Sequence, residues 1–249
     1  MSRLLRSAAM AGGALAALHA LPTLASIGPL RNRFAPRLAG VGRPDHVALT
    51  FDDGPHPLST PRFLALLERL DLRATFFLLG RWADRAPGLA KEIVAAGHEV
   101  GVHGYDHRCL LARGVRATRD DLTRARDVIA DATGQPPRWF RPPYGVLTPA
   151  ALAGAARLGL TPVLWTAWGE DWTARATPES VYRTVLADLH GGGTILLHDS
   201  DVTASPGSWE ATLAAMPRLA ATCHERGLRV GPLAEHGVGG VPAGSAVWP

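Results

Sequence analysis

The sequence predicts an α/β fold in which a single catalytic domain forms a distorted (β/α)7-type barrel. From residue 46 onward, short runs rich in β-forming residues alternate with amphipathic stretches of helical length, a pattern typical of parallel α/β architectures. Ionisable residues directly follow several of these runs, and the carboxyl ends of barrel strands are where catalytic groups gather. With 249 residues and no low-complexity stretch after residue 44, the chain can bury one sizeable core. A doubly wound sheet is the alternative architecture.

The predicted elements alternate along the chain. The strands are expected at residues 46–51, 74–80, 98–103, 138–141, 161–168, 194–199 and 228–232. The helices are expected at residues 60–70, 87–96, 118–133, 148–158, 178–189 and 211–226. Thr177-Pro178-Glu179 is typical of a helix start, and Gly97, Gly134, Gly159 and Gly227 lie just past predicted helix ends.

Residues 1–43 differ in composition from residues 44–249, which we assign to the catalytic domain. They hold six arginines and no acidic residue, and their basic start precedes an Ala-, Gly- and Leu-rich stretch, as in a secretory signal or weak membrane anchor. A helix that packs on the domain or lies in the membrane surface is the alternative. We therefore expect a secreted or membrane-associated protein, with a cytoplasmic location as the alternative.

The basic character of the chain comes from that segment alone. The formal net charge is +4, but the remaining residues hold 20 basic and 22 acidic side chains, so we expect no nucleic acid partner. Cys109 and Cys223 fit no zinc-finger or redox spacing. Their redox state and the oligomeric state stay open.

Asp52 and Asp53 end the first predicted strand, before a Gly54-Pro55 turn. A hydrolytic metal site needs one carboxylate to hold the cation and another acceptor to take a proton from water. A strand that merely finishes in an Asp-Gly turn is the simpler interpretation of this motif alone.

His103 and His107 are spaced so that two imidazoles could face the same side of a helical turn. With Asp53 they would form a three-ligand set that leaves coordination positions open for water, as hydrolytic zinc requires. An isolated pair of histidines at this spacing is more often incidental. The paired aspartates favour the metal site.

Two further segments carry candidate catalytic groups. Arg141 could grip a carboxylate, and the prolines beside it could aim the Tyr144 backbone N–H at a substrate oxygen. His198 ends a buried-type strand, as a proton donor would, and Asp171 could orient it. Each of these two segments could instead have a purely structural role. The three indoles of Trp165, Trp168 and Trp172 could stack on sugars or simply fill a core.

The ordered set of these motifs, over roughly residues 45–232, resembles the polysaccharide deacetylases with a NodB-type domain, carbohydrate esterase family 4. The resemblance implies a distorted barrel that binds a divalent metal, most often Zn²⁺, through Asp53, His103 and His107. It implies that Asp52 is the general base paired with Arg141. The Tyr144 amide would stabilise the oxyanion, and His198, oriented by Asp171, would protonate the leaving amine, while Trp172 and Leu196 would line the acetyl pocket.

Two residues depart from the family pattern. Gly104 stands where Ser or Thr commonly follows the first metal histidine, so a supporting hydrogen bond would be missing or supplied by Asp106. Trp168 stands where a carboxylate is usual. We expect metal binding to survive both departures.

The resemblance favours a metal-dependent hydrolase that removes N-acetyl groups from an N-acetylated sugar polymer, oligomer or lipid-linked sugar. The alternatives are an amidohydrolase acting on a non-sugar amide with the same scaffold, and a non-catalytic glycan-binding domain. The sequence does not name the sugar, its length or the physiological metal.

Overall fold

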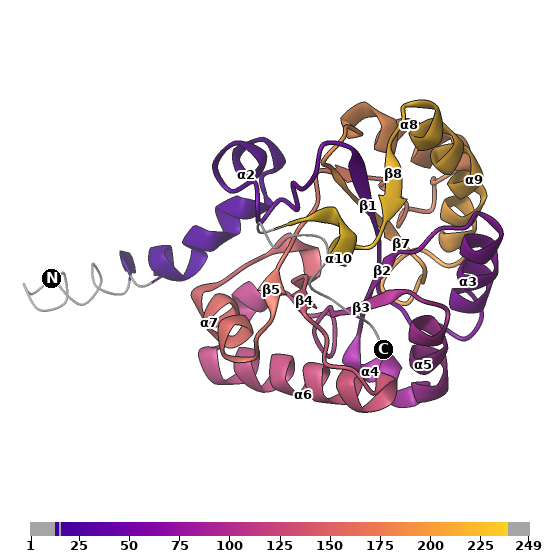
Figure 1. Cartoon of the computed structure of the whole chain (residues 1–249). Helices are drawn as coiled ribbons and strands as arrows, with labels where there is room; N and C mark the ends of the chain where they lie inside the picture. Colours follow the sequence, from indigo (N-terminus) through magenta and orange to yellow (C-terminus); the bar gives the residue numbers. More distant parts are fainter. Residues whose placement is uncertain (1–12, 15, 239–249) are drawn as a thin grey trace, which may run out of the picture.

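A computed structural model describes residues 13–14 and 16–238 as a curled, parallel β-sheet surrounded by helices (Figure 1). The strands follow the order β5-β4-β3-β2-β1-β7-β6, and β8 pairs with the start of β1. Every pairing is parallel. The α/β fold and the distorted barrel predicted from the sequence are confirmed.

The strands are short, and helices connect most of them. The strands are β1 (His46–Asp52), β2 (Thr75–Leu78), β3 (Glu99–Val102), β4 (Trp139–Phe140), β5 (Thr161–Pro162), β6 (Ala167–Trp168), β7 (Thr194–His198) and β8 (Arg229–Gly231). The α-helices are α2 (Gly28–Phe34), α3 (Thr60–Arg69), α4 (Gly80–Arg85), α5 (Pro87–Ala95), α6 (Val115–Thr133), α7 (Pro149–Arg157), α8 (Pro178–Asp188), α9 (Trp209–Glu225) and α10 (Leu233–His236). The 3₁₀ turns are η1 (Leu21–Ser26), η2 (Leu110–Ala112) and η3 (Pro143–Gly145).

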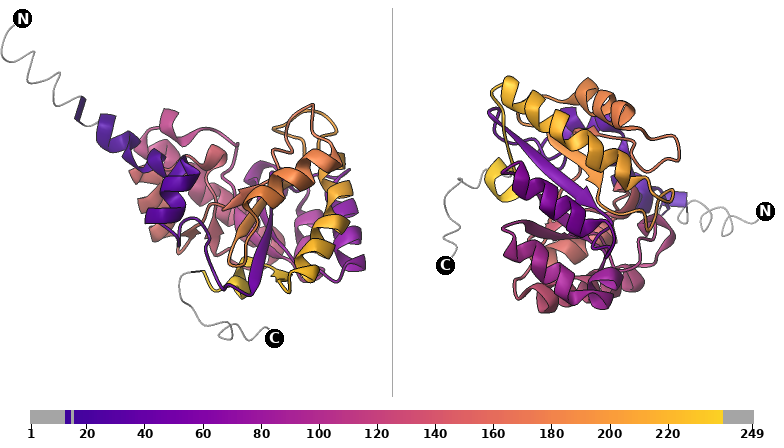
Figure 2. Two further views of the ribbon diagram at one scale, coloured as in Figure 1. Left: turned by 90° about the horizontal axis from the view of Figure 1, so that it is seen from above. Right: turned by 90° about the vertical axis from the view of Figure 1, so that its right-hand side faces the viewer.

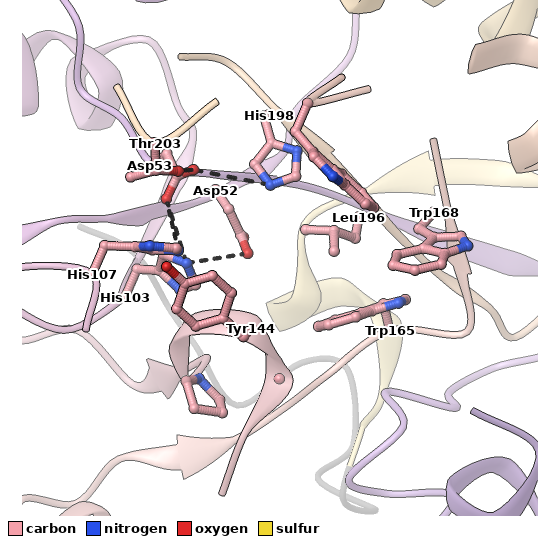
Figure 3. A pocket seen from close by; sticks show the side chains of 13 residues that line it. Asp52, Asp53, His103, His107, Tyr144, Trp165, Trp168, Leu196, His198 and Thr203 are labelled. Carbon is pink, nitrogen blue, oxygen red and sulfur yellow. Dashed lines mark hydrogen bonds and ion pairs between the residues drawn. The ribbon is translucent and has the colours of Figure 1, made fainter. Parts of the chain in front are cut away.

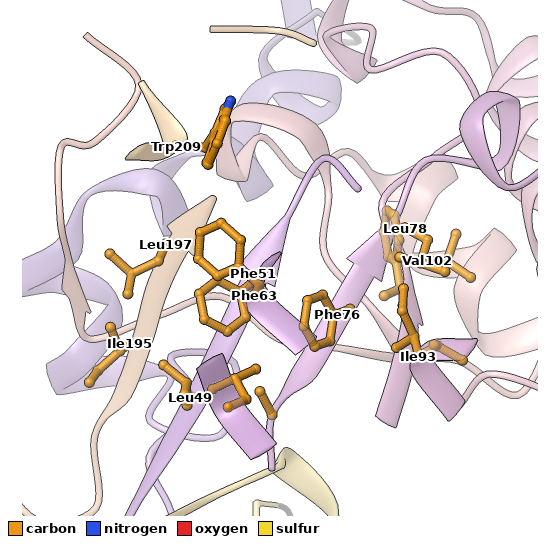
Figure 4. Packing of buried hydrophobic residues seen from close by; sticks show 14 of the residues in the cluster. Leu49, Phe51, Phe63, Phe76, Leu78, Ile93, Val102, Ile195, Leu197 and Trp209 are labelled. Carbon is orange, nitrogen blue, oxygen red and sulfur yellow. The ribbon is translucent and has the colours of Figure 1, made fainter. Parts of the chain in front are cut away.

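The core is centred on β1, all seven of whose residues are buried. A parallel strand that is covered on both faces has a nearly continuous run of apolar residues in its sequence. Phe51 packs its ring 5.1 Å from those of Phe63 on α3 and Phe76 on β2 (Figure 4). This packing fixes β1 in the centre of the sheet, so the residues at its carboxyl end are held rigidly.

The predicted strand at residues 161–168 is wrong, because the structure divides this run into two short strands. β5 pairs with β4, whereas β6 pairs with β7 on the other side of the barrel. The carbonyl groups between them bind buried arginines instead of a neighbouring strand: Arg141 Nη2 donates to Leu164 O at 2.9 Å, and Arg31 donates to Trp165 O. The chain therefore crosses from one edge of the sheet to the other here.

Helix α4 was not predicted from the sequence. It begins at Gly80, where the predicted strand at residues 74–80 was expected to end. The amide of Leu79 donates to Gly54 O, and that of Gly80 donates to Gly104 O, so these residues bond to neighbouring loops instead of continuing the β2 ladder.

The amino-terminal segment packs against the barrel (Figures 1 and 2). Residues 1–12 and 15 of the predicted signal or membrane-associating segment 1–43 lie outside the described residues. The part that is described includes η1 and α2, and the Leu164 amide donates to Leu38 O. Among the described residues, no helix combines the length and the apolar character needed to cross a bilayer.

Candidate active site

The carboxyl end of β1 places two adjacent carboxylates at the floor of a pocket (Figure 3). Asp52 is the last residue of the strand and lies opposite His198 of β7 in the ladder. Asp53 follows with a left-handed backbone (φ 77°), and a Cβ on Gly54 would come within 2.6 Å of the Asp199 carboxylate. This sharp turn sends the two aspartate side chains to different partners.

Asp53, His103 and His107 converge on one point, with a potential ligand atom from each lying within 4.8 Å of the others. The Nε2 atoms of both histidines lie 3.5 Å from Asp53 Oδ1. Two ligands about 2.1 Å from a tetrahedral ion are roughly 3.4 Å apart. The separations are therefore those that a zinc-sized cation between these atoms would need.

The surroundings of these three residues also fit a cation. Asp53 Oδ1 is buried and has no hydrogen-bond partner among the residues that the structure describes, although buried carboxylate oxygens are normally satisfied. His103 Nδ1 donates to Arg141 O at 2.8 Å, which directs the Nε2 lone pair toward Asp53. Burial lowers the pKa of His103 to about 3, so its imidazole is neutral, as a metal ligand must be.

Asp52 is held apart from this cluster by Arg141. Arg141 Nη1 donates to Asp52 Oδ1 at 2.7 Å, while Asp52 Oδ2 lies 3.7 Å from His103 Nε2. Both side chains are almost fully buried. Burial raises the pKa of Asp52, and the Arg141 charge opposes that rise. The outcome is a basic carboxylate with one oxygen turned toward the cation position.

His198 and Asp171 form a second polar pair on the other side of the pocket. His198 Nδ1 and its backbone N–H each donate to Asp171 at 2.8 Å, and the Thr212 hydroxyl donates at 2.6 Å. Burial alone would lower the pKa of His198, but Asp171, Asp53 and Asp52 together raise it to about 10. His198 is therefore a cationic imidazole whose Nε2 lies 4.0 Å from Asp53 Oδ2.

Aromatic side chains form the wall of the pocket. Tyr144, with a left-handed backbone (φ 60°) in η3, lies near His107, whose ring is 4.7 Å from the tyrosine ring. Trp165 and Trp168 stack 6.1 Å apart and lie across the pocket from that pair (Figure 3). Trp172 and the buried Leu196 also line it. The pocket thus joins an ionisable end to an apolar, aromatic end.

The two departures from the family pattern have structural counterparts. Gly104 has φ 83°, and the segment after it is held by Asp121, whose Oδ2 accepts from the Tyr105 amide at 3.1 Å. The suggestion that Asp106 supplies this support is wrong, because Asp106 pairs with Arg81 at 2.5 Å. Trp168 packs between Trp165 and Trp172, so Asp171 binds His198 without a second carboxylate from that position.

The structure brings all ten predicted site residues to one end of the barrel, around or directly behind the pocket. Several contributors were not predicted. Thr203 donates a hydrogen bond to Asp53 Oδ2, Thr212 holds Asp171, and Thr50 accepts from Arg141 at 2.8 Å. Lone threonines carry no spacing or motif, so only the three-dimensional arrangement identifies them.

Known proteins resemble this chain in sequence and in fold. A family model described as polysaccharide deacetylase matches residues 39–163. The chitooligosaccharide deacetylase of Sinorhizobium fredii is 36% identical over 210 residues, which cover 82% of this chain and 96% of that protein. The solved structure of a family 4 carbohydrate esterase from Streptomyces lividans, in complex with acetate, has a TM-score of 0.68 and 35% identity, and the match covers 76% of this chain and 93% of the other.

A second similar structure comes from a protein that is described as lacking enzymatic function. It is a Bacillus anthracis protein described as a pseudoenzyme of carbohydrate esterase family 4, with a TM-score of 0.70 and 31% identity over 77% of this chain and 65% of the other. Because a pseudoenzyme shares the fold, catalytic activity depends on the side chains in the pocket and not on the fold alone.

Proposed function

This chain belongs to the polysaccharide deacetylase family, and on that premise we propose that it is a metal-dependent hydrolase that removes the N-acetyl group from an N-acetylated sugar. The observation that carries the proposal is the unpartnered, buried Oδ1 of Asp53, which faces two imidazole nitrogens at 3.5 Å. A buried carboxylate oxygen in that position is costly unless a cation binds it. Asp53, His103 and His107 are the residues that would hold the ion, and Zn²⁺ is the ion that we propose.

A divalent cation supplies Lewis acidity, which polarises the amide carbonyl and makes water easier to deprotonate. Asp52 is the general base in this proposal. Its Oδ1 is occupied by Arg141, so Oδ2 is the oxygen that takes the proton from the attacking water. The raised pKa of Asp52 makes it a stronger base than an exposed aspartate.

Attack of the water oxygen on the carbonyl carbon converts the carbonyl oxygen into an oxyanion. Tyr144 lines the pocket, and its backbone N–H is the donor that we assign to that oxyanion. His198, held by Asp171, donates a proton to the sugar nitrogen as the carbon–nitrogen bond breaks. Acetate and a free amino sugar are the products, and the amine is a good leaving group only once it has been protonated.

The proposal is tested by measuring acetate release from a panel of N-acetylglucosamine oligomers, peptidoglycan fragments and lipid-linked N-acetyl sugars. Mass spectrometry of the product should show one acetyl group replaced by hydrogen. Chelator should abolish the reaction, and added Zn²⁺ should restore it. Asp52→Asn should lower kcat by about 10²–10⁴-fold while the protein still binds Zn²⁺. Acetate release that survives both the chelator and the Asp52→Asn substitution would contradict the mechanism.

A further inference from the structure

The amino-terminal segment is attached to the rim of the pocket. Arg31 is only 3% exposed, and its guanidinium donates to Trp165 O at 2.5 Å and to Ala25 O at 3.0 Å. It also lies 5.0 Å from the ring of Trp165, a residue that lines the pocket. The Thr23 hydroxyl donates to Leu147 O, just beyond η3. Residues 16–37, which we call the N-terminal arm, are thus anchored beside the site.

The arm presents large apolar side chains to solvent. Six of the eleven exposed large hydrophobic residues in the described part of the chain belong to it, namely Leu18, Leu21, Leu24, Ile27, Leu30 and Phe34. From residue 18 to residue 30 they recur at every third position. Side chains three residues apart align in a 3₁₀ turn such as η1, so Leu21 and Leu24 lie on one side of it, and the exposed Ile27 follows directly in an extended backbone conformation. We call these three residues the apolar row.

The charges beside this row favour an anionic partner. Residues 1–43 contain no acidic residue. Arg33 of α2 and Arg37, shortly after it, are exposed, and α2 is in contact with η1. An apolar face flanked by arginines binds at the surface of bilayers that contain anionic lipids. A symmetric pairing of two copies through the same face would instead bring these arginines close to one another.

We propose that the N-terminal arm binds the surface of an anionic membrane and holds the pocket there, so that the substrate is an N-acetylated sugar carried on a lipid. The arm lies along one flank of the barrel, and its amino-terminal end extends away from that flank (Figures 1 and 2). Arg31 connects the arm directly to the Trp165 wall. The inference of membrane binding depends only on the side chains of the arm. The inference of a lipid-linked substrate also rests on the proposed deacetylase function.

The first experiment measures binding of the full chain to vesicles of phosphatidylglycerol and phosphatidylcholine, and to vesicles of phosphatidylcholine alone. We expect the mixed vesicles to bind the protein more tightly. Leu21→Ser/Leu24→Ser should lower the partition coefficient by about tenfold or more, and Arg33→Gln/Arg37→Gln by about fivefold per charge on the mixed vesicles only. The matched control is Val115→Ser/Leu152→Ser, which alters two exposed apolar residues of the barrel and should bind as the wild type does.

Three outcomes would overturn membrane binding. One is equal partition of the Leu21→Ser/Leu24→Ser variant and the wild type. Another is a dimer in sedimentation experiments that this double variant dissociates, because the apolar row would then be an interface between copies. The third is a mature protein, isolated from its native cells, whose first residue lies after Ile27.

The second experiment tests the substrate. Acetate release is compared for a soluble N-acetylglucosamine oligomer and for the same sugar attached to a lipid in mixed vesicles. We expect Leu21→Ser/Leu24→Ser to reduce the rate on the vesicle substrate about tenfold and to leave the soluble rate unchanged. Equal reduction of both rates would overturn the lipid-linked assignment. If neither substrate releases acetate while the vesicles still bind the arm, the proposed deacetylase function fails and membrane binding stands.

Discussion

Arg141 Nη1 donates a 2.7 Å hydrogen bond to Oδ1 of Asp52, and the ion pair that they form is buried behind the pocket floor. The same guanidinium also donates to the Thr50 hydroxyl at 2.8 Å and to the Leu164 carbonyl at 2.9 Å. These hydrogen bonds hold the Arg141 guanidinium in one orientation, and the guanidinium in turn holds Oδ1 of Asp52 in place. The other oxygen of Asp52 is left for proton transfer.

The first prediction concerns the acid limb of the pH–rate profile. Burial raises the pKa of Asp52 and Arg141 opposes that rise, so Arg141→Met should raise the pKa of Asp52 further. The base must be ionised to work, and therefore the acid limb of kcat/KM should move to higher pH. Kinetic measurements across the acidic range check this. Arg124→Gln, at an exposed arginine 3.9 Å from Asp84, is the control and should leave the limb in place.

Removing one member of a buried ion pair also destabilises a fold, by about 3–5 kcal/mol. Arg141→Lys keeps the positive charge and serves as a second variant if Arg141→Met does not fold. Because lysine cannot reproduce the planar fork, we expect a smaller shift of the acid limb and a lower kcat. An unshifted acid limb in both folded variants would refute the role assigned to Arg141.

The second prediction concerns the basic limb. Asp171 is the main group that holds the pKa of His198 high, against the opposing effect of burial. Asp171→Asn removes that charge, so the pKa of His198 should fall and the imidazole should lose its proton at lower pH. The basic limb of kcat should then move to lower pH, with a lower maximum. Thr212→Val removes only a hydrogen bond to Asp171 and should shift the limb much less. A larger shift in Thr212→Val than in Asp171→Asn would contradict this assignment.

The barrel and the clustering of ionisable residues were predictable because both follow from local patterns. Asp52 and His198 end apolar runs, and the carboxyl ends of parallel strands meet at one edge of the sheet. Other features depend on contacts between distant residues. Residues 161–168 read as one strand, but Arg141 and Arg31 bind their carbonyls and divide the run. Asp121 lies in α6 without a motif of its own, although it supports the segment between the two histidines.

The third prediction separates metal binding from structural support. His107→Ala and His103→Ala should both remove the stabilisation that a saturating ion gives, roughly 3–4 kcal/mol at 100–1,000 times Kd. In the presence of chelator, however, the two variants should differ in their free energy of unfolding. His103→Ala also empties a buried position and leaves the Arg141 carbonyl without its donor, which adds about 1–3 kcal/mol of destabilisation. His107 is partly exposed, so its loss should cost less.

Thermal unfolding with and without Zn²⁺, together with calorimetric titration of the ion, checks this prediction. Wild-type protein whose melting temperature is the same in Zn²⁺ and in chelator would contradict the metal site. His56→Ala is a suitable control, since His56 is a partly buried histidine outside the ligand set, and it should leave the Zn²⁺ titration unchanged.

The fourth prediction concerns Gly104, whose left-handed backbone (φ 83°) joins β3 to the segment that carries His107. A Cβ at this position would lie 3.2 Å from Asp121 Oδ2, the oxygen that accepts from the Tyr105 amide. Gly104→Ala should therefore destabilise the protein by about 1–2 kcal/mol and weaken Zn²⁺ binding, because the backbone between His103 and His107 would shift.

Gly88→Ala is the matched control: Gly88 lies in α5 with open space around its Cβ position, where alanine should stabilise the helix by up to about 1 kcal/mol. Denaturant unfolding measures both effects, and equal stability of the Gly104→Ala variant and the wild type would show that the left-handed backbone is not needed at this position.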